Sequence, residues 1–146
     1  MDDAARPRFA EISTAFPTVP ESVAAARRFV SASLRRFDFS DGAVEQAALA
    51  TSELVASAFG SGRPPIRIRV RSIADGRASV EVNHRADGDP TDPDAVPADL
   101  QLTAAGRTVV DSMATRWGSR PTDSGVIAWF EIDDPMRSGA AVTGSA

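Results

Sequence analysis

Apolar residues return at three- and four-residue steps in three stretches of the chain, which is the spacing of one helix face. They predict helices over about residues 20–37, 40–59 and 100–115. The hydroxyl of Ser40 suits an N-cap for the second helix, and Gly60 and Gly62 favour its end. The residues expected on the buried sides are Val23, Ala26, Val30, Leu34, Phe37, Val44, Ala47, Thr51, Leu54 or Val55, Ala58, Leu102, Val109, Val110 and Met113.

After the second helix, apolar and polar residues alternate, a pattern that is typical of a strand with one solvent-exposed face. Apolar residues at 66, 68 and 70 alternate with Arg67, Arg69 and Arg71. Asp75-Gly76 is a tight-turn sequence, so residues 79–83 are expected to return as the antiparallel partner. The other predicted strands lie over residues 8–16, just after Gly118, and over 126–132.

Two polar stretches are predicted to lie outside the regular structure. Residues 86–99 hold five Asp and three Pro with almost nothing to bury, which favours a mobile loop. Residues 133–146 are expected to form a flexible tail, which leaves a single domain over 1–132. The order of elements predicts an α+β fold: a two-layer sandwich with three helices on one face of a mostly antiparallel sheet.

The composition excludes several classes of chemistry. Cysteine is absent, and His84 is the single histidine, so no metal site is expected. Lysine is absent too, which excludes a Schiff-base or P-loop lysine. A net charge of −4 argues against direct nucleic-acid binding. Apolar runs far shorter than about 20 residues predict no membrane span, and the expected location is the cytoplasm.

Glu53 and Ser57 lie four residues apart on the second helix, away from its apolar stripe, so both side chains could face one pocket. A solvated helix face is the alternative. The segment TSELVASAF around them, together with PESVAAARRFV, VVDSMATRWGSRP and VIAWFEI, resembles the anti-sigma factor/serine-protein kinase family of the GHKL (histidine-kinase-like, Bergerat-fold) ATPase superfamily. The likeness covers about residues 8–132.

The resemblance implies roles for particular positions. Glu53 matches the catalytic base, whereas Ser57 stands where the family has the asparagine that holds Mg²⁺. His84 takes the place of the aspartate that accepts the adenine amino group. In the glycine turn that cradles phosphates, Ala104 replaces the first glycine and Gly106 is retained. These departures indicate a degenerate nucleotide site, so neither ATP nor Mg²⁺ is expected as a cofactor.

Three functions follow from these observations. The first is a binding protein that recognises a sigma factor or a STAS-domain anti-anti-sigma protein without catalysis. The second is an active Mg-ATP-dependent serine-protein kinase, and the third is a scaffold or dimerisation module. The resemblance also implies a homodimer. Arg27, Arg28 and Arg35 are candidate partner-binding residues, because arginine pairs well with carboxylates; the alternative is that they only solvate the helix.

The remaining conspicuous side chains have plain structural interpretations. The three strand arginines either grip an acidic partner or form a solvated face with Arg67 or Arg69 close to Glu81. Trp117 and Trp129 are expected to pack in the core or on the sheet.

Overall fold

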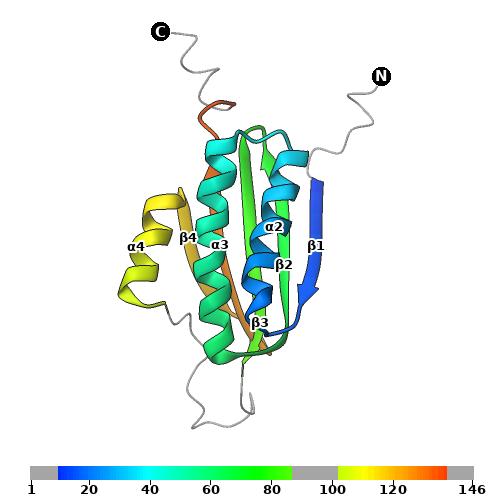
Figure 1. Cartoon of the computed structure of the whole chain (residues 1–146), viewed down its shortest axis with the longest axis vertical. Coiled ribbons are helices and arrows are strands. Elements are labelled where there is room, and N and C mark those ends of the chain that lie inside the picture. The colour runs from blue at the N-terminus through cyan, green and yellow to red at the C-terminus, as the bar shows by residue number, and fades with distance from the viewer. Residues whose placement is uncertain (1–9, 87–101, 138–146) are drawn as a thin grey trace.

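A computed structural model describes residues 10–86 and 102–137 of the chain. In these residues a five-stranded antiparallel sheet has the order β1-β2-β3-β5-β4. Helices α2 and α3 cover one face, and α4 lies beside α3 near β4 (Figure 1). This confirms the predicted two-layer α+β fold. The elements are β1 (Ala10–Phe16), α2 (Glu21–Arg36), α3 (Asp41–Ser61), β2 (Gly62–Ala74), β3 (Arg77–Ala86), α4 (Ala104–Met113), β4 (Arg116–Pro121) and β5 (Gly125–Asp133).

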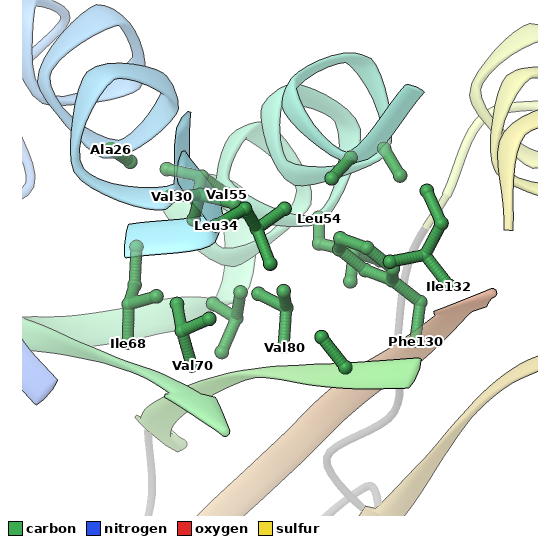
Figure 2. Close-up of a cluster of buried hydrophobic side chains, with 14 of the residues drawn as sticks. Ala26, Val30, Leu34, Leu54, Val55, Ile68, Val70, Val80, Phe130 and Ile132 are labelled. Carbon is green, nitrogen blue, oxygen red and sulfur yellow. The ribbon is translucent and has the colours of Figure 1, made fainter. Parts of the chain in front are cut away.

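The core lies between the two long helices and the sheet. Alternate residues of β2 and β3 point toward the helices, and the register pairs Ile68 with Val82 and Val70 with Val80. Leu34 from α2 and Phe130 from β5 complete this layer, and each of these side chains is fully buried (Figure 2). Burial of such side chains contributes about 1.5–3 kcal/mol each, so this contact holds the helices on the sheet.

The predicted β2–β3 hairpin is confirmed. Its turn contains Gly76, whose φ of 75° lies in the left-handed region that favours glycine. On the face away from the helices, Arg69 pairs with Glu81, as one reading of the sequence expected: Nε lies 2.8 Å from Oε1. Arg120 approaches the other carboxylate oxygen of Glu81 at 3.6 Å.

Three helix ends differ from the prediction. Helix α3 continues through Gly60 to Ser61, and β2 begins at the next residue. Helix α4 begins at Ala104 instead of near residue 100, because the side chain of Thr103 caps it. It also ends before residue 115, since the backbone amide of Thr115 already donates to Glu131 O in the sheet at 2.9 Å.

The first residues of the predicted tail are part of the folded domain. Asp133 is the last residue of β5, and Asp134 is completely buried. Both carboxylate oxygens of Asp134 accept hydrogen bonds from Ser40, at 2.7 Å from the backbone amide and 2.8 Å from the hydroxyl. The folded part of the chain therefore reaches beyond residue 132. Ala86, the first residue of the predicted acidic loop, is the last residue of β3, whereas residues 87–99 of that loop and residues 138–146 of the tail lie outside the described residues.

Candidate functional site

Glu53 and Ser57 lie one turn apart on α3, and both are partly exposed. Their neighbours Leu54, Val55 and Ala58 are buried against the sheet. The buried stripe of α3 therefore holds the helix in place, with Glu53 and Ser57 beside the stripe; the hydroxyl oxygen of Ser57 is itself buried.

Glu53 meets the first turn of α4. A Cβ added at Gly106 would lie 3.0 Å from Oε2 of Glu53 and 3.2 Å from Oγ1 of Thr103. Gly106 itself is buried, so a side chain at this position would be crowded by both groups. The absence of a side chain at Gly106 lets α4 pack closely on α3. Two of the positions implied by the family resemblance are thus brought together.

The N-terminus of α4 is closed by its own cap. Oγ1 of Thr103 accepts a hydrogen bond from the backbone amide of Gly106 at 2.9 Å. Ala104 is the exposed first residue of the helix and does not have a positive φ, so this segment is a regular capped helix start and not a glycine turn. One of the amides that could point at a phosphate is therefore already satisfied within the protein.

His84 lies near the end of β3, opposite Val126 of β5, and only 1% of it is exposed. Neither ring nitrogen has a hydrogen-bond partner among the described residues. Burial lowers the pKa of His84, and the backbone of Arg85, which acts in the opposite direction, is the smaller effect. The imidazole is therefore neutral near pH 7.

Together, the residues at the candidate nucleotide positions offer few groups that can hold a metal ion or bond to a nucleotide. Glu53 supplies a carboxylate, whereas Ser57 supplies only a short hydroxyl and His84 a buried neutral ring. In residues 10–86 and 102–137 there is no cluster of three or more histidine, aspartate or glutamate side chains that could hold a metal ion.

The three arginines singled out on α2 line one groove. Arg27, Arg28 and Arg35 lie on the side of α2 opposite its buried stripe, where α2 runs beside α3. The groove has a volume of about 540 Å³, and Glu45, Ala48 and Leu49 of α3 form its other wall. Sequence reasoning found the arginines but missed these α3 residues, because nothing in the sequence says which faces of two helices lie side by side.

Thr103 was also missed by the sequence prediction. A threonine directly before a helical stretch is a recognised N-cap signal, but the apolar Leu102 favoured an earlier helix start.

Trp117 and Trp129 are packing residues, as the sequence predicted. Trp117 packs partly against the core, and Trp129 lies against Gly118 on the uncovered face of the sheet.

None of the helices in the described part of the chain is sufficiently long and apolar to cross a membrane.

Comparisons with known proteins agree with this architecture. The family described as the histidine kinase-like ATPase domain matches residues 16–125. Among solved structures, the chain is similar to the crystal structure of the RsbU and RsbW domains of Rv1364c from Mycobacterium tuberculosis, with a TM-score of 0.63 and 13% identity. That match covers 85% of this chain and 32% of the other, so the chain spans about a third of its length. No curated protein matches the sequence.

Proposed function

The chain belongs to the family of histidine kinase-like ATPase domains, and on this basis we propose that it is an anti-sigma-factor-like regulatory protein that binds its partner without using ATP. The proposed partner is a sigma factor or a STAS-domain anti-anti-sigma protein. The segments that resemble anti-sigma factors support the proposal, as does the fold shared with about a third of the chain that holds the RsbU and RsbW domains of Rv1364c.

The observation that carries the proposal is the hydrogen bond between Thr103 and Gly106. The hydroxyl oxygen of Thr103 accepts a hydrogen bond from the Gly106 amide at 2.9 Å, in the helix turn where the family binds phosphates. The carboxylate of Glu53 lies against the same turn. A nucleotide phosphate at this place would have to displace the cap.

The other positions also fit Mg-ATP poorly. Ser57 has no carbonyl oxygen with which to hold Mg²⁺ in the way that an asparagine does. His84 is buried and neutral, whereas the adenine amino group calls for an acceptor that is accessible to the ligand. We therefore derive no catalytic step through ATP. The chemistry that remains is protein recognition by the surface of the fold.

A second candidate function is an active Mg-ATP-dependent serine-protein kinase. One observation favours it: Glu53, the position of the family's catalytic base, is retained and lies next to the first turn of α4. We rank it below the binding protein because the site lacks both the family's metal ligand and an open phosphate-binding turn. A catalytic base alone cannot orient the transferred phosphate.

The experiment that tests the proposal measures partner binding with and without nucleotide. Purified sigma factors and STAS-domain proteins of the same organism are titrated into the protein by calorimetry, in buffer alone and with Mg-ATP. We expect one of them to bind with the same affinity in both conditions. Binding that requires Mg-ATP, or loss of phosphate from ATP to a bound STAS protein, would favour the kinase. Absence of binding by every candidate would overturn the proposal.

We also propose that the protein is a homodimer and that Arg27, Arg28 and Arg35 of α2 take part in partner recognition. The family resemblance is the basis of the first statement. The exposure of the three arginines beside one groove supports the second. Light scattering tests the dimer: a mass near twice 15.3 kDa is expected, and a mass near 15.3 kDa at high concentration would contradict it.

A further inference from the structure

Helices α2 and α3 form an open groove on the side of the helical layer that faces away from the sheet. Along α2 its lining extends from Ala24 to Arg35, which corresponds to about 16 Å or three helical turns. Its opposite wall is the solvent-facing side of α3 between Glu45 and Leu49. The shape is therefore that of a seam between two parallel cylinders, which suits an elongated ligand better than a compact metabolite.

The groove is positively charged in an acidic protein. Three arginines line it against one acid, Glu45, although the whole chain carries a net charge of −4. Arg27 and Arg28 form no ion pair with any residue in the described part of the chain. Arg35 approaches Asp41 only at 3.9 Å, and the Asp41 side chain is 92% exposed, so this pair is worth little. The guanidinium groups are thus available to an acidic ligand.

The groove is also apolar. Leu49 is 47% exposed, and among the large apolar side chains that are exposed in the described residues it alone lies in a helix. Ala24, Ala32 and Ala48 line the groove with it, and their small side chains leave room above the backbone. A ligand that covered Leu49 would remove apolar area from water and gain about 25 cal/mol per Å².

Charge and shape together define the occupant. We propose that the α2–α3 groove binds an amphipathic helix of the partner protein, with apolar side chains over Leu49 and Ala48 and carboxylates paired to Arg27, Arg28 and Arg35. A helix laid into a groove presents apolar residues at three- and four-residue steps, and flanking carboxylates match the fork of arginine. This inference rests on the proposed function as a partner-binding protein and names the chemistry of the partner.

The direct test uses a synthetic helical peptide with leucines along one face and glutamates on both sides of them. Its binding is followed by the NMR shifts of the backbone amides. We expect shifts confined to residues 24–35 and 45–49, and no binding of a control peptide in which lysine replaces every glutamate. If the acidic peptide leaves these amides unchanged, or if the lysine peptide binds equally well, the inference is overturned.

Variants of the protein separate the groove from general charge effects. The double variant Arg28→Glu/Arg35→Glu and the single variant Leu49→Asp should each weaken peptide binding at least tenfold, which is about 1.4 kcal/mol. The matched control is Arg67→Glu/Arg85→Glu, since both residues are exposed on the sheet and form no ion pair with any described residue. It changes the net charge equally and should bind as the parent does. Equal losses in both double variants would contradict the inference.

The natural partner provides the last distinction. If a sigma factor or STAS protein binds and the groove variants bind it as tightly as the parent, the groove inference is wrong and the proposed function stands. If no such partner binds but the acidic peptide occupies the groove, the proposed function is wrong and the groove remains a site for acidic helices. Thermal unfolding of each variant identifies any that has lost its fold, and for Arg28 and Arg35 the milder Gln substitutions then replace Glu.

Discussion

The carboxylate of Glu53 lies against Gly106: a Cβ added at this glycine would lie 3.0 Å from Oε2. Alanine favours a helix over glycine by about 1 kcal/mol, but its methyl group would displace Glu53 Oε2 and Thr103 Oγ1, and such overpacking costs about 1–3 kcal/mol. We expect Gly106→Ala to lower the free energy of unfolding by about 1 kcal/mol in the parent. In the Glu53→Ala background the same change should be neutral or stabilising. Urea denaturation of the four proteins measures the coupling, and an equal effect in both backgrounds would show that the contact is absent.

His84 makes the stability depend on pH. Burial lowers its pKa in the folded protein, whereas the unfolded chain binds the proton near pH 6.5. The unfolded state therefore binds more protons as the pH falls below about 6.5, and the free energy of unfolding decreases until the folded pKa is reached. The slope can reach about 1.4 kcal/mol per pH unit.

The comparison that isolates this effect is between the parent and His84→Leu. His84 is the single histidine, so no other side chain has an ordinary pKa in this window. From about pH 7.5 to about pH 5.5 the parent should lose about 1 kcal/mol more stability than the variant. Parallel stability curves would mean that the ring is not buried as a neutral group.

Asp134 anchors the start of α3 from the other end of the chain. Its carboxylate accepts two hydrogen bonds from Ser40 and one from the backbone amide of Met136, and hydrogen bonds to a charged group contribute about 1.5–3 kcal/mol. We expect Asp134→Ala to lower the free energy of unfolding by about 2–3 kcal/mol, and Ser40→Ala by less, because the backbone amide bond remains. A loss below about 0.5 kcal/mol for Asp134→Ala would show that Asp134 contributes little to the stability of the fold, as expected for a residue of a tail.

The pKa of Asp134 predicts how this loss varies with pH. Burial alone would raise the pKa, but the hydrogen bonds from Ser40 and Met136 and the charge of Arg137 together bring it below its ordinary value. The stabilisation by the ionised group is therefore fully present above about pH 3.9 and is lost as the pH falls through the lower folded value. The difference between the parent and Asp134→Ala should shrink in strong acid, well below the window of His84.

The sequence predicted those parts of the fold that depend on local periodicity. Alternation around Ile68 predicted the strand, its wet face and its partner across Gly76, because a period of two and a turn sequence are both local signals. The pairing of Glu53 with the first turn of α4 followed only from the family resemblance. Spacing alone placed Glu53 on a helix face and could not say which element would meet it.

Two features depended on contacts between distant segments and were not predictable. Asp134 bonds to Ser40 across 94 residues, and the polar sequence after it resembled a tail. The wall of the groove formed by Leu49 depends on how α3 lies beside α2, whereas periodicity predicts only that Leu49 is outside the buried stripe. Thr103 was different: its signal was local, and the competing apolar residue at 102 obscured it.

Restoration of the family's residues tests whether the nucleotide site was lost at these positions. The triple variant Ser57→Asn/His84→Asp/Ala104→Gly supplies a metal-binding amide, a smaller acidic acceptor in place of the imidazole and a flexible turn. We expect it to recover some affinity for Mg-ATP, and adding Thr103→Ala should increase it by freeing the amide of Gly106. No recovery in a folded triple variant would show that other residues close the site.

Calorimetric titration of the unmodified protein with Mg-ATP tests the central claim most directly. The capped first turn of α4 and the buried neutral His84 both oppose a bound nucleotide. The predicted result is no binding heat, with any Kd weaker than about 1 mM, or about −4.1 kcal/mol. A Kd near about 1 μM, or about −8.2 kcal/mol, would contradict the account and establish a nucleotide-binding protein.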